Sequence, residues 1–265
     1  MSGNAKSMGD SKTKQDTLFV GSLEKGMRVM SAFDGNHPEL GLSEIAAIIG
    51  LDKSATQRLT NTLHKTGYLI KDPESRRFRP SLRFLELAYS YFWSDPLVQL
   101  TIPKLIELGR TLGERVNAAR LDGHEIVYVI RIPTQFTSFS AMLVGRRVPA
   151  LTTSSGRILI ANFSEERRRH AIETWPLVPA TAKTTLDRTV IAAEIDEAAA
   201  QGYAIAASQN ILNEIGIAAP LFNAAGEPVA TVQCSVSALK WSLERVRAEI
   251  APSLIEVANS IQLPR

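Results

Sequence analysis

Side chains that can hydrogen-bond to DNA gather on one side of residues 51–69, "LDKSATQRLTNTLHKTGYL". Leu59 and Leu63 lie four residues apart, which predicts a helix with one buried face. Glutamine and asparagine amides can pair with adenine, and an arginine guanidinium can pair with guanine, each through two hydrogen bonds. The residues that we predict to contact base edges are Thr56, Gln57, Arg58 and Asn61.

A second group of polar and basic side chains suits the phosphate backbone. Hydroxyl groups, lysine and arginine bind phosphate oxygens without reading the sequence, and this binding weakens with salt. Residues 51–79 hold 7 Lys+Arg against 3 Asp+Glu, whereas the whole chain has a net charge of only +3. A merely solvated basic face would give the same count. The residues that we predict to contact phosphates are Ser43, Lys53, Ser54, Lys71, Arg76 and Arg77.

A third candidate site is the hydroxyl-rich stretch "TTSSGRILIA", residues 152–161, where a helix is predicted to start near Ser154 or Ser155. Free amides and the dipole at a helix start attract carboxylates and phosphates. Ordinary helix capping explains the same residues, so both interpretations stay open. If the chain were an enzyme acting on small acids, one of these serines would be the nucleophile. No histidine lies near either serine in the sequence.

Other patterns of catalytic or metal-binding residues are missing from the sequence. His37, His64, His124 and His170 are scattered, and none has the spacing of metal ligands. There is no Walker loop and no G-x-G-x-x-G, and "TTSSG" lacks the first glycine of a nucleophile elbow. We therefore predict no metal, no cofactor and no enzymatic activity.

The predicted DNA-contacting residues need a scaffold, which residues 17–80 provide. "SLEKGMRVMSAF" predicts a helix capped by Ser22, and "LSEIAAIIG" predicts a helix with Ser43 as its N-cap. The short turn "GLDK" then leads into the polar helix, and two short helices so joined form a helix–turn–helix. "TGYLIKD", "DPESR" and "RFRPS" predict a basic hairpin, so the unit is a winged helix–turn–helix.

Residues 81–95, "SLRFLELAYSYFWSD", predict a linker helix that is apolar around most of its circumference. Such a helix must be buried, because it would otherwise expose a large apolar patch. We expect it to pair with the same helix of a second subunit, although packing against its own two domains is an alternative. In a homodimer, two recognition helices would read half-sites about one helical turn, or a few turns, apart.

Residues 96–265 alternate strand and helix patterns and predict an α+β sensor-like domain. We expect a mixed, mostly antiparallel sheet with its helices to one side. "FTSFSAML", residues 136–143, is predicted to be a strand, and "SLERVRAEIAPSLIEVANSIQ", residues 242–262, one long closing helix.

Length and composition fit a two-domain globular protein, with 265 residues, 45% hydrophobic and 22% charged. No stretch approaches a membrane span, and residues 1–16, "MSGNAKSMGDSKTKQD", predict a disordered polar tail and not a secretory signal. A single cysteine, Cys234, excludes an internal disulfide. These features predict a cytoplasmic protein without membrane contact.

From about Phe19 onward the chain resembles the IclR-type transcriptional regulators. The residues that carry the resemblance are "SLEKGMRVMSAF", "LSEIAAIIGLDKSATQRLTNTLHKTGYL", "GRRVPALTTSSGRILIA" and "QGYAIAASQNILNEIGIAAPLFNAAGEPVATVQCSVS". The resemblance implies a GAF-like effector-binding domain, dimers or dimers of dimers, a double-stranded DNA operator and a small organic acid effector. RNA polymerase is a further candidate partner. "FVGSLEKGMRVMSAFDGNHPELGLSEIA" and "RRFRPSLRFLELAYSYFWSD" look most like the branch that governs protocatechuate and para-hydroxybenzoate catabolism.

The same resemblance implies a set of effector contacts, which falls on Ser154, Ser155, Ala206, Gly216, Ser235 and Ser237. Many members carry an acid and a cysteine where this chain has Ala206 and Gly216. Gln209 replaces the usual Glu and Asn213 the usual Gly, and asparagine tolerates the left-handed backbone conformation. Ala206 and Gly216, with the nearby Ile211 and Leu212, predict a roomier and more apolar cavity that suits an aromatic or longer acid.

The sequence therefore predicts a ligand-responsive transcriptional regulator of aromatic-acid catabolism. Its expected organisation is a DNA-binding domain over residues 17–80, a linker helix over 81–95 and an effector-binding domain over 96–265. Effector binding would shift the placement of the two winged domains through the linker. The alternatives are the serine-nucleophile enzyme and an architectural DNA-binding dimer without a ligand. Effector identity, operator sequence, activation or repression, and dimer or tetramer stay open.

Overall fold

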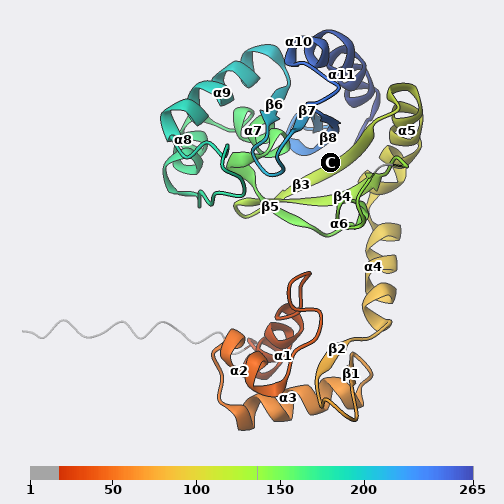
Figure 1. Cartoon of the computed structure of the whole chain (residues 1–265), viewed down its shortest axis with the longest axis vertical. Coiled ribbons are helices and arrows are strands. Elements are labelled where there is room, and N and C mark those ends of the chain that lie inside the picture. Colours follow the sequence, from red (N-terminus) through yellow and green to blue (C-terminus); the bar gives the residue numbers. More distant parts are fainter. Residues whose placement is uncertain (1–17, 136, 265) are drawn as a thin grey trace, which may run out of the picture. The chain divides into compact units, whose positions relative to one another are not determined.

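The computed structural model describes residues 18–135 and 137–264, which form two compact units (Figure 1). The chain passes from the first unit to the second between Tyr91 and Phe92. The polar tail expected over residues 1–16 lies outside the described residues. None of the described helices has the length and apolar character needed to cross a membrane.

The first unit is a winged helix–turn–helix, as its sequence predicts. Its elements are α1 (Gly21–Ser31), α2 (Leu42–Ile49), α3 (Lys53–Lys65), β1 (Leu69–Lys71) and β2 (Phe78–Pro80). Val29, Ile45 and Leu69 meet in the core of the unit. The two strands form an antiparallel hairpin, and Phe78 also exchanges backbone hydrogen bonds with Leu40, which fastens the hairpin to the segment before α2.

Two of the predicted helix caps are wrong. α1 begins at Gly21 and α2 at Leu42, so that Ser22 and Ser43 are both the second residue of their helices. At α2 the side chain of Glu44 reaches back to accept a hydrogen bond of 2.6 Å from the Gly41 N–H. This bond satisfies the helix start without a hydroxyl, because half of a capping box is enough to bind one free amide.

α4 (Arg83–Ser94) matches the linker helix that its apolar sequence predicts, but no residue of α4 is buried within the single chain. Leu85 and Leu87 are 66% and 51% exposed. An apolar helix surface of this kind marks an interaction site.

The second unit is built on a sheet in which, within the described residues, six strands are all antiparallel, in the order β5-β4-β3-β8-β7-β6. The strands are β3 (Arg115–Asp122), β4 (Glu125–Ile132), β5 (Arg147–Pro149), β6 (Ala204–Ala207), β7 (Glu214–Phe222) and β8 (Pro228–Ser237). The helices are α5 (Pro96–Leu112), α6 (Phe139–Met142), α7 (Ser154–Ala161), α8 (Glu165–Thr174), α9 (Arg188–Gln201), α10 (Leu243–Arg245) and α11 (Ala251–Ser260).

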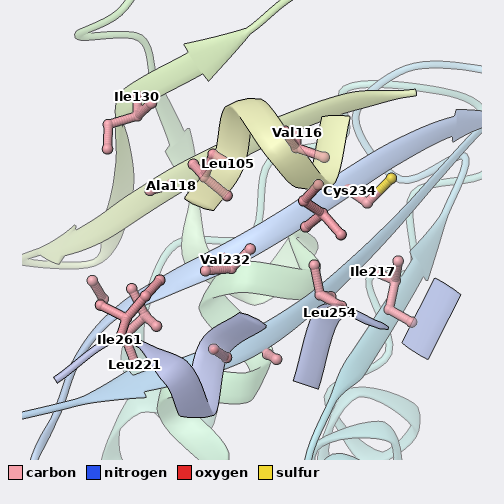
Figure 2. Close-up of a cluster of buried hydrophobic side chains, with 14 of the residues drawn as sticks. Leu105, Val116, Ala118, Ile130, Ile217, Leu221, Val232, Cys234, Leu254 and Ile261 are labelled. Atoms are coloured by element: carbon pink, nitrogen blue, oxygen red, sulfur yellow. The ribbon is translucent and has the colours of Figure 1, made fainter. Parts of the chain in front are cut away.

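Helices cover both faces of this sheet, so the expectation of helices to one side is wrong. α5 and α11 pack on one face, where Leu105, Val232 and Leu254 belong to the larger hydrophobic core (Figure 2). α7 packs on the other face, beside α9. Both faces need covering because both are apolar. In β7 the successive residues Ile217 and Ala218 point to opposite faces, and each belongs to the hydrophobic core on its side.

Two further elements differ from prediction. Within the segment 136–143 that was predicted to be a strand, the described residues 137–143 do not form one, because the backbone turns after Ser138 into the single turn of α6. The long closing helix is interrupted, since α10 and α11 are separated by a π-helical stretch over Val246–Ile250. Pro252 has no N–H to donate, and its position in the first turn of α11 accounts for the change of hydrogen-bond pattern.

Candidate functional site

α3 exposes most of the polar side chains that were predicted to contact DNA. The helix begins after Asp52, whose carboxylate accepts a hydrogen bond of 2.8 Å from the Ala55 N–H. Leu59 and Leu63 pack against the core of the unit. The exposed predicted residues of α3 are Lys53, Ser54, Gln57, Arg58 and Asn61.

A groove of about 680 Å³ runs between α3 and the hairpin. The predicted residues that line it are Gln57, Arg58, Asn61, Lys71 and Arg76. The groove thus brings base-reading candidates from α3 and phosphate-binding candidates from the wing to one surface. Ser43, Lys53 and Ser54 are exposed but do not line this groove.

The wing is the hairpin of β1 and β2, and the turn at its tip is stabilised by hydrogen bonds to backbone amides, with Arg76 exposed. Asp72 accepts hydrogen bonds from the N–H groups of Ser75 at 2.6 Å and Glu74 at 3.1 Å. The Ser75 amide, followed by its hydroxyl, lowers the pKa of the Asp72 carboxyl. Arg76 adopts the left-handed conformation, with φ of 59°. The turn therefore needs no arginine side chain to stabilise it.

Arg77 is held by partners in α2 and in the segment before it. Its guanidinium lies 2.9 Å from the Glu44 carboxylate and donates to the Glu39 carbonyl at 2.8 Å. The Gly41 N–H, and then Arg77, lower the pKa of Glu44. Arg77 therefore ties the wing to α2, and a phosphate contact there would have to compete with Glu44.

Thr56 is the predicted base contact that the structure contradicts. Its side chain is fully buried, and its hydroxyl donates to the Asp52 carbonyl at 2.9 Å. Position 56 lies three residues before Leu59, so it falls on the core face of the helix. A hydroxyl that returns to its own backbone in this way cannot reach a base edge.

His64 lines the same groove, although it was not among the predicted contacts. Its Nδ1 lies 3.0 Å from the Leu69 carbonyl oxygen, which fixes the ring against the start of the wing. The signal is present in the sequence, because His64 follows Asn61 by three positions and Gln57 by seven, and such residues share one helix face.

Substitutions at Thr56 and Gln57 should have different effects, the first on the stability of the fold and the second on the recognition of DNA. Thr56→Ala is expected to lower the free energy of unfolding by about 1 kcal/mol, because it removes a buried hydroxyl and its hydrogen bond to the backbone. The preference for particular bases should be unchanged. Gln57→Ala should leave stability unchanged and weaken specific DNA binding. Thermal unfolding and binding to operator and random DNA measure both effects. Loss of sequence preference in Thr56→Ala would contradict the buried placement.

In the second unit, the start of α7 forms one wall of a small cavity. Thr153 caps the helix by accepting a hydrogen bond of 2.9 Å from the Gly156 N–H. The cavity measures about 30 Å³, far below the roughly 300–1,000 Å³ typical of ligand pockets. Its lining residues are Tyr128, Thr153, Ser154, Ala206, Gln209, Asn210, Ile211, Glu214, Gly216 and Gln233.

The predicted effector contacts do not all meet at this cavity. Ser154, Ala206 and Gly216 line it, whereas the hydroxyl of Ser155 accepts a hydrogen bond of 2.9 Å from Thr231 and pins α7 to β8. The Ser155 side chain therefore faces β8 and does not line this cavity, and its effector contact stays a prediction. Ser235 and Ser237 line a neighbouring hollow of about 270 Å³. The two hollows share Ile211 and Glu214 as a common wall.

The expectation of a roomy, apolar cavity is wrong. A Cβ atom on Gly216 would lie 3.0 Å from the Gln233 amide nitrogen and 3.1 Å from the Ser154 hydroxyl, so these side chains occupy the space beside the glycine. Gln209 is buried and accepts a hydrogen bond of 2.8 Å from the Thr185 N–H. Polar side chains therefore fill the volume that the small residues leave.

The loop between β6 and β7 keeps the turn that asparagine was predicted to preserve. Asn213 has a φ of 60°, which confirms the left-handed conformation at this position. Its N–H donates to the Ser208 hydroxyl at 3.1 Å. Asn210 joins the loop to the start of α7, because its amide donates to the Thr152 carbonyl at 2.7 Å.

Sequence reasoning missed the polar residues that the strands contribute. Asn117 on β3, Tyr128 and Arg131 on β4 and Gln233 on β8 lie at or beside the cavity. Each is a polar or aromatic residue with apolar or cysteine neighbours on both sides in its strand, and a buried polar group in such a place needs a specific partner. That pattern is the signal that would have found them.

A winged helix–turn–helix followed by an α+β domain with a polar cavity defines the class of ligand-responsive transcriptional regulators. The chain belongs to the IclR family of that class. Residues 22–73 match the IclR helix-turn-helix domain, and residues 90–263 match the bacterial transcriptional regulator IclR C-terminal domain. These are families of regulators and not of enzymes, so the serine-nucleophile alternative is not supported.

Similar proteins share both parts of the chain. The Pca regulon regulatory protein of Pseudomonas putida is 28% identical over 247 residues, which cover 93% of this chain and 84% of that protein. The crystal structure of a Rhodococcus sp. RHA1 protein assigned as a transcriptional regulator is 31% identical, with a TM-score of 0.79 over 92% of this chain and 97% of the other. An IclR homolog from Microbacterium hydrocarbonoxydans, complexed with 4-hydroxybenzoate, has 22% identity and a TM-score of 0.75, covering 91% and 97%.

Proposed function

We propose that this protein regulates genes of aromatic-acid catabolism and that its C-terminal domain binds an aromatic acid as effector. The observation that carries the proposal is the similarity to the Pca regulon regulatory protein along 93% of the chain. The 4-hydroxybenzoate complex of the Microbacterium homolog supports the same class of ligand. The polar cavity at the start of α7, together with the adjoining hollow, is the proposed effector site.

The charges around the cavity support an anionic effector. Arg115, Arg131 and Arg146 all act electrostatically on Tyr128, whereas Glu214 is the one acidic group among its main electrostatic neighbours. Glu214 is already paired, since its carboxylate lies 2.5 Å from the Arg115 guanidinium. Positive charge therefore exceeds negative charge at the cavity, and a carboxylate would restore the balance.

DNA binding in this proposal uses the groove between α3 and the wing. Gln57, Arg58 and Asn61 read base edges, whereas Arg76 and Lys71 supply salt-dependent contacts to phosphates. The remaining proposed phosphate contacts are Ser43, Lys53, Ser54 and Arg77. Residues 17–80 would form the DNA-binding domain, 81–95 the linker and 96–265 the effector-binding domain.

Pairing of two subunits through α4 completes the proposal, and a homodimer or dimer of dimers would place two winged domains on two half-sites.

Leu85→Lys is expected to shift the protein from dimer to monomer, because it puts a charge on an apolar contact. Glu86→Lys, a neighbour on the polar side of α4, is the matched control and should stay dimeric. Sedimentation velocity measures both. A dimeric Leu85→Lys protein with unchanged affinity would rule out α4 as the interface.

The experiment for effector class uses the full-length protein and the DNA upstream of its own gene. Calorimetry with 4-hydroxybenzoate, protocatechuate, pyruvate and glyoxylate should show the tightest binding to an aromatic acid. The same acid should change the affinity for DNA in a gel-shift assay, because effector and operator binding are linked. Tightest binding to pyruvate or glyoxylate would refute the aromatic effector.

A further inference from the structure

Arg131 is a buried arginine whose charge has no acidic partner. It lies on β4 and is 8% exposed. Its Nε donates to the Asn117 amide oxygen at 3.3 Å, and one terminal nitrogen lies 3.5 Å from the Leu143 carbonyl. Within residues 18–135 and 137–264, no carboxylate comes within ion-pairing distance of this guanidinium. Burial of a charge that is bonded only to neutral groups is costly.

A β-bulge turns Arg131 toward the cavity side of the sheet. In the β3–β4 pair, Ala118 is opposite Ile130 but Ala119 is opposite Tyr128, so Val129 is the extra residue. Without the bulge, residues 128 and 131 would point to opposite faces. With it, the Arg131 guanidinium lies 4.3 Å from the centre of the Tyr128 ring. Ile130 points into the opposite core (Figure 2). Bulges often re-aim side chains next to functional sites.

A row of hydrogen bonds connects Arg131 to the cavity. Asn117 is in register with Arg131 on one side and with Gln233 on the other. The Asn117 amide nitrogen donates to the Gln233 oxygen at 2.5 Å, and the Gln233 nitrogen donates to the Ser235 hydroxyl at 2.8 Å. Tyr128 and Gln233 both line the cavity. Arg131 therefore contacts one cavity-lining residue directly and reaches another through Asn117.

The guanidinium keeps its charge in this place. Burial lowers the pKa of Arg131 to about 10, so that the side chain stays protonated at neutral pH. The other positive groups near it, Arg115 and Arg146, add to the unbalanced charge. Glu214 does not neutralise it, because Glu214 is held by Arg115. A bound anion would supply the missing partner.

We propose that Arg131, supported on the Tyr128 ring, is the carboxylate-binding residue of the effector cavity. This inference rests on the proposed effector function and names the group that selects acids over neutral ligands. An arginine pairs with a carboxylate through two parallel hydrogen bonds, which gives direction as well as attraction. The bond between Asn117 and Gln233 is the element that must open, because the cavity measures only about 30 Å³, whereas ligand pockets typically measure roughly 300–1,000 Å³.

The variant that tests this inference is Arg131→Met, which keeps the length of the side chain and removes its charge. Calorimetry would compare 4-hydroxybenzoate with the neutral 4-hydroxybenzamide. We expect the variant to bind the acid at least tenfold more weakly than the wild type and the amide equally well. The melting temperature of the ligand-free variant should equal or exceed that of the wild type, because an unpaired buried charge is removed. Gel shifts without effector should be unchanged.

Arg146→Met is the matched control, since it removes a neighbouring positive charge that does not belong to the row, and its acid binding should change less than threefold. A lower melting temperature for ligand-free Arg131→Met would show that Arg131 is structural and would overturn the inference. Unchanged acid binding in Arg131→Met would also overturn it, while the effector proposal would stand. If the wild type bound none of the four acids of the effector panel, both proposals would fall together.

Discussion

Gly156→Ala is expected to prevent the C-terminal domain from forming its native structure. A Cβ atom at position 156 would lie 2.1 Å from the Ala150 carbonyl oxygen and 2.5 Å from both the carbonyl carbon and the Cα of Ala150. These atoms belong to the backbone of the 3₁₀ turn that precedes α7, so no side-chain rotation can relieve the overlap. α7 contacts β6, β7, β8 and α9, and it therefore cannot move without breaking the packing on one face of the sheet.

The cost of this substitution should fall in the exceptional range for a single residue, about 4 kcal/mol or more. Circular dichroism during thermal unfolding measures it, and soluble yield gives a second readout. Gly26→Ala is the matched control, because Gly26 lies within α1 and a Cβ there meets no atom within 4 Å. That change should be neutral or stabilising by roughly 0.5–1 kcal/mol. A Gly156→Ala protein that melts within a few degrees of the wild type would contradict the close approach of α7 to residue 150.

The DNA-binding unit could be predicted from the sequence because its signals are local. Gly50 ends α2 in the left-handed conformation, with φ of 65°, and the next helix starts three residues later. Leu59 and Leu63 fix which side of α3 is buried, and hence which polar residues are exposed. Thr56 was wrongly predicted to be exposed because its polar side chain was taken as a sign of the exposed side. Its position around the helix, three residues before Leu59, places it on the buried side.

The effector site could not be predicted to the same extent because residues far apart in the sequence build it. Ser154 comes from α7, Gly216 from β7 and Gln233 from β8, and their proximity depends on the strand order. The place of Tyr128 beside Arg131 depends on one extra residue in β4. Strict alternation along a strand would place Tyr128 and Arg131 on opposite faces of the sheet. The sequence alone therefore does not reveal that the bulge brings the two side chains together.

Volume was the weakest basis for predicting the ligand. Ala206 and Gly216 suggested an open cavity because each has a smaller side chain than many family members carry at that position. Gln233, on the neighbouring strand, fills that space and bonds to Asn117 at 2.5 Å. The size of a cavity depends on every side chain that faces it, so small residues at two positions do not predict an open space.

Arg58→Ala and Arg76→Ala should weaken DNA binding in two distinguishable ways. Arg58 lies on the exposed face of α3 within the groove, where a guanidinium can form two hydrogen bonds to guanine. Its loss should cost about 1–3 kcal/mol on the operator and much less on random DNA. Arg76 lies at the tip of the wing, and its loss should weaken binding to both DNAs alike and reduce the salt slope by about one.

Fluorescence anisotropy with operator and random duplexes, each titrated at several salt concentrations, separates these outcomes. Salt matters because a phosphate contact releases counterions, whereas a bond to a base edge does not. Arg110→Ala, on α5 of the other unit, serves as a control for loss of a positive charge outside the groove and should leave both affinities unchanged. If Arg58→Ala and Arg76→Ala produced the same losses and the same salt slopes on both DNAs, the division of the groove into a base-reading helix and a phosphate-binding wing would be wrong.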